Sequence, residues 1–297
     1  MELVLTAARE GRVLGFLRGE LALSSTLVKR LKQQRAIFVD GQAAHTDCLV
    51  ARGAEIRVVV EGEPPSYPAE AGALDVLWED EAILAVDKPA GVWVHPTPSR
   101  QTGTLANWVA FHLRGARCGV HVVTRLDRDT FGVVLFAKNA HIHALLSRAL
   151  QEGRIEKRYL ASVCGIPAPL DGFVDMPIAR RPGGSLLREV NADGQRALTG
   201  YRVISDGDGL SLLELRPETG RTHQLRVHCQ ALGCPILGDR AYGTAASLAR
   251  SEGLGIRTQQ LCAKALTFSH PLSGERLTIS SRQNPTFPKL TVETSGN

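Results

Sequence analysis

Apolar positions near the start of the chain first follow a helical period and then a strand pattern. Two amphipathic helices are expected, the second capped by Ser24 or Ser25. A hairpin that turns at Asp40-Gly41 and a strand over residues 55–60 follow. Residues 1–62 are therefore predicted to form a small α/β unit.

A proline-rich stretch separates this unit from a longer one. Residues 63–72 contain three prolines and no periodic pattern, which is typical of a linker. From residue 73 to 285, short apolar strands alternate with a few amphipathic helices, and residues 286–297 form a tail. Strands are expected at residues 74–78, 82–86, 132–137, 157–163 and 210–215, and helices at 105–113 and 142–150. The pattern predicts a mixed α/β or α+β domain.

An ionic cluster interrupts the apolar pattern of this domain. Arg125, Asp127, Arg128 and Asp129 lie between two β-branched runs. A carboxylate placed between core strands costs several kcal/mol, on the order of the buried-charge penalty, unless it is paired or used. Asp127 is thus a candidate functional residue, although in isolation it could merely cap a turn.

A second polar segment can supply the partner of that carboxylate. Residues 218–228 begin with a glycine turn and with Thr222, a residue type suited to starting a helix. Such a turn can present Arg221 to a carboxylate, so an Arg221–Asp127 pair is expected.

These two segments carry a family resemblance. The R-L-D-x-x-T-x-G string at 125–132 and the G-R-T-H-Q-L-R-V-H string at 220–228 resemble the RNA pseudouridine synthases, in the RluA-type branch that contains the large-subunit ribosomal RNA enzymes. Further motifs occur in the order of that family: Asp87–Gly91, Val94–Pro96, Lys157–Ala161, Gly238-Asp239, Tyr242-Gly243, Phe268 and His270-Pro271. The resemblance covers about residues 73–285.

The resemblance implies both a fold and a reaction. The fold is α+β, with a mostly antiparallel bent sheet and a central catalytic cleft. The reaction breaks the bond from ribose carbon 1′ to the uracil nitrogen, rotates the base and joins it through carbon 5. It is redox-neutral and needs a carboxylate, a closed pocket and a group that removes the carbon 5 proton. Neither a metal nor an organic cofactor is expected.

Three residues match the catalytic positions of the family. Asp127 matches the catalytic aspartate; whether it attacks the sugar, adds to the base or removes a ribose 2′ proton stays open. Arg221 matches the basic residue that keeps this carboxylate ionised, or else contacts a phosphate. Tyr159 matches the active-site tyrosine, whose ring stacks on the extruded base, although a lone strand tyrosine is more often core.

Further residues are expected to contact the substrate. Leu126 and Leu225 line the pocket or are ordinary core residues. Four cationic side chains contact RNA phosphates or pair with neighbouring carboxylates: Lys88, Arg125, Arg128 and Arg226.

The chain departs from the common pattern of the family at four positions. Thr124 and Phe131 stand where histidine and serine are common, and Gln195 and Cys262 where lysine and histidine are common. These departures leave Asp127 in place, so activity is still the favoured interpretation. They leave the RNA choice and the rate open.

The N-terminal unit resembles the alpha-L RNA-binding module of a small-subunit ribosomal protein. Its expected second helix has a run of cationic side chains without an acidic residue among them: Lys29, Arg30, Lys32 and Arg35. Arg35 stands where the module usually has glycine, and Asp40 where it usually has asparagine. The helix either binds RNA or is a solvated basic face.

Composition narrows the remaining choices. A net charge of +5 and a pI near 9.0 are compatible with a polyanionic partner, and 43% hydrophobic residues suffice for one or two domains. The six cysteines form no C-x-x-C pair, and the His223, His228, Cys229, Cys234 spacing is not that of a zinc finger. No stretch approaches the roughly 20 apolar residues of a membrane span, and the first residues lack the basic flank of a signal peptide. A cytoplasmic monomer is expected.

Two functions of different class remain. An RNA pseudouridine synthase acting on ribosomal RNA, or alternatively on transfer RNA, is favoured because the three catalytic positions are filled. A non-catalytic RNA-binding or ribosome-assembly protein on the same fold is the second. A carboxylate hydrolase is disfavoured because no second catalytic acid stands out.

Overall fold

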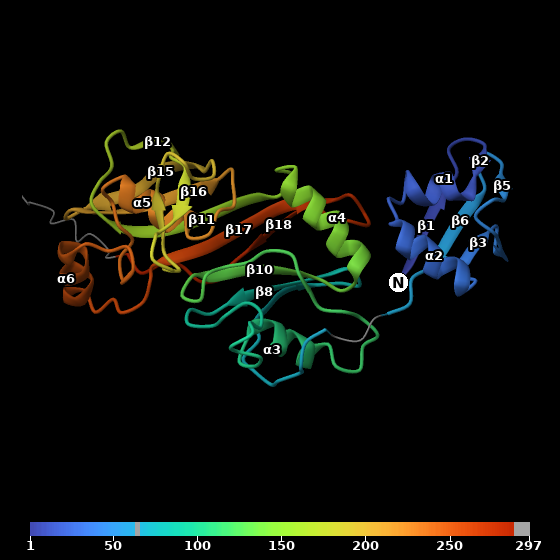
Figure 1. Ribbon diagram of the computed structural model, residues 1–297, viewed down its shortest axis with the longest axis horizontal. Helices are drawn as coiled ribbons and strands as arrows, with labels where there is room; N and C mark the ends of the chain where they lie inside the picture. Colours follow the sequence, from blue (N-terminus) through green and yellow to red (C-terminus); the bar gives the residue numbers. More distant parts are fainter. Residues whose placement is uncertain (63–65, 288–297) are drawn as a thin grey trace, which may run out of the picture.

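A computed structural model describes residues 1–62 and 66–287 of the chain, and Figure 1 shows a small N-terminal unit beside an elongated body. Most of the expected tail and part of the expected linker lie outside the described residues.

The N-terminal unit consists of two helices packed on an antiparallel sheet of strand order β1-β6-β3-β4. Its elements are β1 (Glu2–Thr6), β2 (Gly11–Arg12), α1 (Val13–Arg18), α2 (Ser25–Gln33), β3 (Ile37–Val39), β4 (Gln42–Ala43), β5 (Leu49–Val50) and β6 (Glu55–Val59). The expected cap of α2 is Ser24, whose hydroxyl accepts a hydrogen bond from the Leu27 N–H at 3.1 Å. Fully buried Phe16, Leu17 and Ile56 join both layers.

The expected hairpin turn is present in the N-terminal unit. Asp40 and Gly41 have φ of 48° and 78°, the positive pair that a two-residue turn of the type I′ class requires. Arg35 also has a positive φ, 53°, at the position where the resembling module usually has glycine. Lys29, Lys32 and Arg35 are exposed, whereas Arg30 is half-buried and has interactions within the protein.

The body is built on one ten-stranded sheet. Its main path has the order β12-β15-β16-β11-β17-β10-β8-β7, with β18 beside β17 and β9 beside β10. The strands are β7 (Val76–Glu79), β8 (Ile83–Lys88), β9 (His121–Val122), β10 (Phe131–Ala137), β11 (Glu156–Cys164), β12 (Asp171–Asp175), β15 (Leu198–Gly207), β16 (Leu210–Pro217), β17 (Leu261–Ser269) and β18 (Arg276–Ser280). All described pairs are antiparallel except the short contact of β10 with β17. The expected α+β class with a mostly antiparallel sheet is confirmed.

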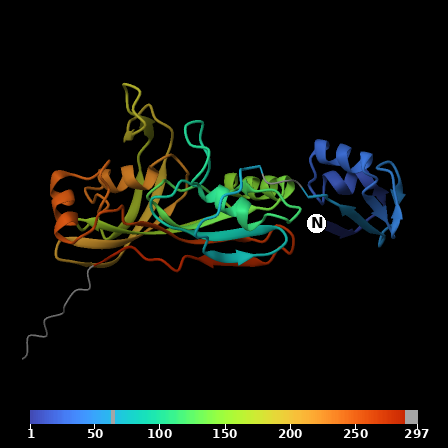
Figure 2. The same ribbon diagram turned by 90° about the horizontal axis from the view of Figure 1, so that it is seen from below.

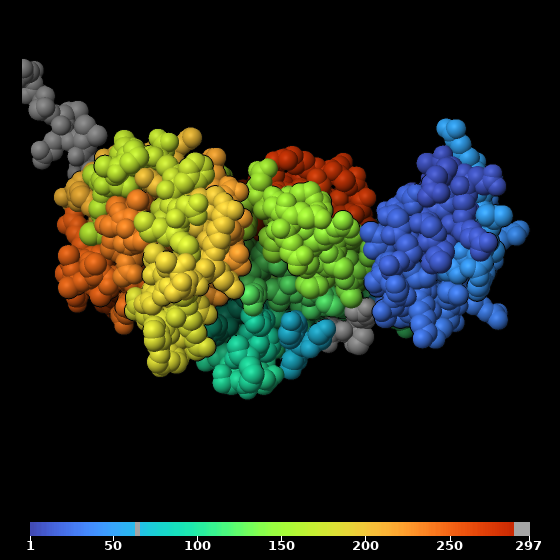
Figure 3. Space-filling model, turned by 45° about the horizontal axis from the view of Figure 1, so that its top comes forward, coloured from blue at the N-terminus to red at the C-terminus, as the bar shows by residue number. Residues whose placement is uncertain are grey.

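Strand β17 joins two halves of this sheet. The first half carries α3 (Leu105–His112) and α4 (Ala140–Gln151); the second carries α5 (Gln224–Ala231), α6 (Ala245–Gly253) and a separate hairpin of β13 (Ile178–Arg180) and β14 (Arg188–Val190). Figure 2 shows the hairpin and the loop before α3 projecting from the same side of the sheet. The space-filling view is hollowed between the two halves (Figure 3). A cleft thus lies between the two halves of the body.

Gly132 explains the glycine of the R-L-D-x-x-T-x-G string. It has φ of 110°, and a Cβ there would lie 2.3 Å from the carbonyl oxygen of Ala263. Only glycine permits β10 to cross β17 this closely. The motif therefore specifies a strand crossing directly after the turn that bears Asp127.

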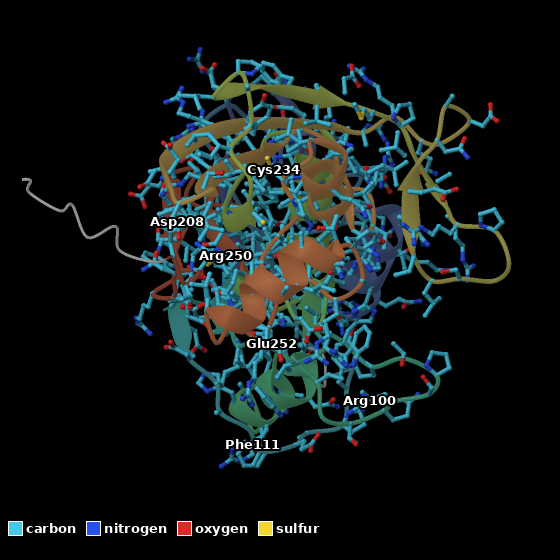
Figure 4. The ribbon with its side chains drawn as sticks, turned by 90° about the vertical axis from the view of Figure 1, so that its left-hand side faces the viewer. Arg100, Phe111, Asp208, Cys234, Arg250 and Glu252 are labelled. Carbon is cyan, nitrogen blue, oxygen red and sulfur yellow. The ribbon has the colours of Figure 1, made fainter. Side chains whose placement is uncertain are left out.

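Buried polar contacts tie distant segments to the sheet. The Asp87 carboxylate accepts hydrogen bonds from the Ser281 hydroxyl, the Arg282 N–H and the Gln283 amide at 2.6 to 3.0 Å. These contacts of Asp87 hold the residues that follow β18 against β8. In the second half of the sheet, Asp208 of the β15–β16 turn pairs with Arg250 of α6 (Figure 4).

The described part of the expected linker packs beside α3 and the loop that precedes this helix. Glu70 accepts a hydrogen bond from the Gly103 N–H at 2.5 Å, and the Asn107 amide donates to the Pro68 carbonyl at 2.8 Å. Between the N-terminal unit and the body, the Asn139 amide lies 3.4 Å from the Met1 sulfur. No described helix combines the length and the apolar character that crossing a membrane requires.

Candidate active site

Asp127 lies in the turn between β9 and β10, at the edge of the cleft. Its Oδ2 accepts a hydrogen bond from Nη1 of Arg226 at 3.0 Å, and its side chain is 28% exposed. Arg226 belongs to α5, on the other half of the sheet. This contact joins residues 99 positions apart and bridges the two halves at the cleft.

A second carboxylate fixes the direction of the Arg226 guanidinium. Nε and Nη2 of Arg226 donate to the two oxygens of Asp239 at 2.7 and 2.9 Å, a bidentate geometry. Asp239 is 1% exposed and also accepts from the Ala241 and Tyr242 N–H groups. Burial lowers the pKa of Arg226, but the contacts with Asp239 and Asp127 outweigh it and raise that pKa above its usual value. Arg226 therefore stays charged beside Asp127.

The expected Arg221–Asp127 pair is wrong. Nε of Arg221 donates to the Arg196 carbonyl at 3.0 Å, and the Arg221 side chain is exposed. The helix also begins later than expected, with His223 rather than Thr222 at its N-cap. Arg221 lies in the turn before the helix, and its backbone N–H donates to Oε1 of Gln224 at 2.9 Å. Arg226 is displaced from this turn by more than one helical turn and reaches the cleft.

His223 is a further neighbour of Asp127. Its Nε2 lies 3.9 Å from Oδ2 of Asp127, and its Nδ1 lies 2.7 Å from the Tyr242 hydroxyl. Burial lowers the pKa of His223, as do Arg226 and Arg188, while the charges of Asp127 and Asp239 raise it less. A neutral imidazole beside Asp127 is expected near pH 7.

Tyr159 contributes a phenol to the same site. It lies in β11, and its neighbours across the sheet are Leu215 in β16 and Ala263 in β17. Burial raises the pKa of Tyr159, and the charge of Asp127 raises it further. The Tyr159 hydroxyl therefore keeps its proton, and the negative charge of Asp127 acts on it.

Lys88 does not face the solvent, so the expected phosphate contact is wrong. The fully buried ammonium donates to the carbonyls of Pro89, Val92 and Arg128 at 2.7 to 2.9 Å. Burial lowers its pKa to about 7, opposed by the charges of Asp129 and Asp127. Lys88 instead holds the backbone at Arg128, next to Asp127. Arg226 is also occupied within the protein rather than presented to a phosphate.

The other residues named from the sequence form ion pairs, pack in apolar clusters or lie at the surface. Arg128 pairs with Asp129 at 2.8 Å, and Leu225 is buried in the apolar cluster that Tyr159 borders. Leu126 is half-buried against the cluster beneath α3. Arg125 is exposed, and within the described residues it has no hydrogen-bond or ion-pair partner. The four basic residues at α2 belong to the N-terminal unit, at the opposite end of the molecule from α5 (Figure 1).

Positions that depart from the family pattern have structural roles here. The Thr124 hydroxyl accepts from the Leu135 N–H at 2.9 Å, and Phe131 is buried at the start of β10. Cys262 is fully buried, and burial raises its pKa to about 11. Gln195 is exposed and pairs with Ile178 through the backbone. None of these side chains displaces Asp127 from its turn.

The histidines and cysteines considered for zinc are used separately. His228 lies between the Thr199 hydroxyl and the Met176 carbonyl, at 2.9 and 3.0 Å, while Cys229 and Cys234 belong to an apolar cluster. Across residues 1–62 and 66–287, no three metal-ligating side chains come together in a way that could hold an ion.

Sequence reasoning named neither His223 nor Asp239 as a site residue. Both lie within strings already noted for their resemblance, so the signal was available. What the strings did not disclose is that the N-cap residue of α5, His223, and Arg226 within that helix both lie beside Asp127. The site thus holds an oriented carboxylate beside a protonated phenol.

The chain is similar to several known proteins. The sequence model described as RNA pseudouridylate synthase matches residues 82–231. An uncharacterized RNA pseudouridine synthase of Bacillus subtilis is 34% identical over 93% of this chain and 91% of its own. The ribosomal large subunit pseudouridine synthase D of Zymomonas mobilis is 39% identical over 72% of this chain and 69% of its own. The human RNA pseudouridylate synthase domain containing 1 structure has a TM-score of 0.60 at 27% identity, covering 73% of this chain and 86% of that one.

Proposed function

Because the chain belongs to the RNA pseudouridine synthase family, an isomerase family, we propose that it converts specific uridines of ribosomal RNA to pseudouridine. Two relatives, from Zymomonas mobilis and Xanthomonas campestris, carry the name ribosomal large subunit pseudouridine synthase D. This supports ribosomal RNA over transfer RNA as the substrate. A substrate of this kind favours a cytoplasmic location, and the protein acts as a monomer.

Asp127 is the catalytic carboxylate in this proposal. The main support is the hydrogen-bonded series Asp127–Arg226–Asp239. In this series the Asp127 carboxylate is partly exposed at the cleft, and the Asp239 carboxylate is buried. Because Asp239 fixes the guanidinium of Arg226, Arg226 cannot move together with Asp127 and holds that carboxylate in one orientation. Asp127 is therefore oriented before the substrate arrives, which reduces the cost of reaching the transition state.

Tyr159, Arg226 and the buried lysine have distinct roles beside Asp127. The Tyr159 ring faces the extruded uracil, with its protonated hydroxyl near the reacting carbon. Arg226 orients the Asp127 carboxylate through its hydrogen bond and takes the role first assigned to Arg221. Lys88 is a positioning residue, since it touches only backbone carbonyls. The N-terminal unit adds RNA affinity through α2.

Asp127→Asn tests the assignment with little change in shape. Pseudouridine formation should fall at least about a thousandfold, because the amide cannot replace a reacting carboxylate, while RNA affinity changes only a few fold. Tritium release from RNA labelled at uridine carbon 5 measures the reaction. The matched control is Asp129→Asn, two residues away and paired with Arg128.

The RNA is identified by mapping pseudouridine in cells that lack the protein. Loss of a site in large-subunit ribosomal RNA supports the proposal, and loss in transfer RNA would replace the substrate. Near-normal tritium release by Asp127→Asn would contradict the catalytic role. An unaltered pseudouridine map in every RNA would favour a binding or assembly function on the same fold.

A further inference from the structure

Trp93 is an exposed aromatic residue in the loop between β8 and α3. It is 42% exposed, and it joins none of the apolar clusters that the described residues form. A tryptophan outside the core keeps a large apolar surface in water instead of adding it to the packing of the protein. The sequence motifs did not assign Trp93 a role.

The other two tryptophans of the chain are used within the protein. Trp108 of α3 packs against the apolar cluster beneath that helix. Trp78 of β7 is 41% exposed, but its indole N–H donates to the Asp80 carboxylate at 2.7 Å. Within residues 1–62 and 66–287, the indole N–H of Trp93 has no hydrogen-bond partner. The aromatic surface of Trp93 is therefore available to a ligand.

The backbone that carries Trp93 is fixed to the start of α3. The Trp93 carbonyl accepts a hydrogen bond from the Leu105 N–H at 2.9 Å, and Trp93 pairs with Thr104 in a short parallel bridge. The next residue, Val94, is 2% exposed, and its carbonyl accepts from the Ala106 N–H at 2.9 Å. A ligand that binds an already ordered segment loses less free energy to ordering it.

The Trp93 segment also adjoins the turn that bears Asp127. Nζ of Lys88 donates to the Val92 carbonyl and to the Arg128 carbonyl, each at 2.7 Å. Val92 directly precedes Trp93, and Arg128 directly follows Asp127. One buried ammonium therefore holds the two backbones side by side, with the indole on one and the catalytic carboxylate on the other.

A second contact between these segments lies on the other side of Trp93. His95 and Arg125 line the same small cavity, and the charge of Arg125 adds to burial in lowering the pKa of His95. Trp93 thus lies between two places where its loop meets the Asp127 turn. That loop projects on the same side of the sheet as the β13–β14 hairpin of the second half (Figure 2).

We propose that the Trp93 indole stacks on an unpaired base of the substrate RNA, within two nucleotides of the target uridine. Aromatic side chains hold unpaired bases in this way, because every base offers a flat π-face. The proposal rests on the proposed function, since it requires RNA at Asp127. It makes Trp93 a positioning residue that holds the strand while the target uridine enters the cleft. It also assigns the substrate an unpaired base beside that uridine.

Abasic nucleotides in the RNA test the stacking contact. Otherwise identical substrates, made around the mapped uridine, each carry one abasic nucleotide at a different flanking position. At one position within two nucleotides of the uridine, the KM of the wild-type enzyme should rise about tenfold with little change in kcat, because a stacked base is lost. Trp93→Leu should raise KM by about the same factor on the natural RNA and should make that one position insensitive. Trp93→Phe retains a ring and should restore most of the affinity.

Tryptophan fluorescence gives a second measurement that does not depend on turnover. An RNA in which cytidine replaces the target uridine binds without the reaction and should quench the emission of the wild-type protein, because a base covers the exposed indole. The matched control is Trp78→Phe, which removes an equally exposed tryptophan on β7 and should leave the quenching in place. Trp93→Phe should abolish most of it.

The possible outcomes separate this proposal from the proposed function. If the KM effects of Trp93→Leu and of the abasic positions add independently everywhere, or if Trp93→Phe quenches as the wild type does, the stacking contact is overturned while the enzyme stays active. A Trp93→Leu variant with lowered Tm and no preferred abasic position would show a structural role, which also overturns it. A wild-type enzyme that forms no pseudouridine in any RNA would contradict the proposed function and the stacking contact together.

Discussion

Arg226 is the residue on which the charges of the site depend. Its guanidinium pairs with the carboxylates of Asp127 and Asp239, and of these two only Asp127 reaches the cleft. Asp239 is almost wholly buried, so its charge has Arg226 as its cationic partner and two backbone N–H groups as further donors. Replacing this cation would leave a buried charge without compensation, which is costlier than losing a surface pair.

Arg226→Met and Arg221→Met should therefore differ sharply. Arg226→Met is expected to cost about 3–5 kcal/mol of unfolding free energy and nearly all turnover, since it leaves Asp239 unpaired and Asp127 unoriented. Arg221→Met is expected to cost below about 1 kcal/mol, because its side chain is exposed. Urea denaturation and tritium release measure both effects. Equal losses in the two variants would contradict the assignment of Arg226.

Sequence reasoning identified the residues here better than their partners. The motifs named Asp127 and Tyr159 for the site, but they paired Asp127 with Arg221 and assigned Arg226 to an RNA phosphate. Which arginine reaches Asp127 depends on how α5 packs against a turn 99 residues away, and the order of residues along the chain does not show that. Lys88 was misjudged for a related reason, since nothing in its neighbourhood along the chain shows that three carbonyls surround it.

At the scale of elements, α2 is the expected source of RNA affinity. Lys29 and Lys32 are exposed on this helix, and the chain turns into β3 through Arg35. The apolar face of α2 is buried against the small sheet, so its basic face is the one available to a polyanion.

Replacing Lys29 and Lys32 by Gln together should weaken binding without altering the chemistry. Two lost phosphate contacts should flatten the dependence of log affinity on log salt by about 1.4–1.8, with kcat at saturating RNA unchanged. Salt titrations with the target RNA measure the slope. The control variant combines Arg148→Gln and Arg154→Gln on the body, where both arginines already pair with Glu152. Identical slopes for wild type and the α2 variant would make the basic face a solvated one.

Local patterns predicted the early elements of the body well, and they gave no strand order for its sheet. The strands near residues 82–86, 132–137 and 157–163 and both amphipathic helices of the body are present with small shifts at their ends. The later strands β15, β17 and β18 were not assigned. Nothing in its own residues places β17 between β10 and β11, because that position depends on partners more than 100 residues away.

For the whole molecule, buried histidines determine how stability responds to acid. Burial is the largest cause of a lowered pKa at His95, His141, His223 and His228. The unfolded chain, with histidine pKa near 6.5, therefore binds protons more readily than the folded one. The histidine contribution to stability is fully present above that pH and declines below it. Lys88, whose pKa burial lowers to about 7, adds a loss of stability in the same direction that begins at higher pH.

Tm should accordingly fall between pH 7.5 and pH 5.5. The lowered pKa values of Glu79 and Asp80 add the same trend only at still lower pH. His141→Leu removes one buried imidazole and should make the decline shallower, by at most about 1.4 kcal/mol per pH unit for each proton no longer taken up. Calorimetry over this range measures both profiles. A Tm that rises on acidification would show the opposite linkage.

The place of β17 in the sheet also determines when the active site is completed during synthesis of the chain. A ribosome releases Asp127 first, Arg226 99 residues later, and only afterwards the strand that joins the two halves. At about 5–20 residues per second, roughly 5–20 s separate the carboxylate from its guanidinium, and more time passes before β18 follows. A nascent chain therefore holds Asp127 without Arg226 while 99 of its 297 residues are added, about a third of its synthesis. Such a chain lacks the guanidinium that orients the catalytic carboxylate, so catalysis starts only after the second half of the sheet has been made.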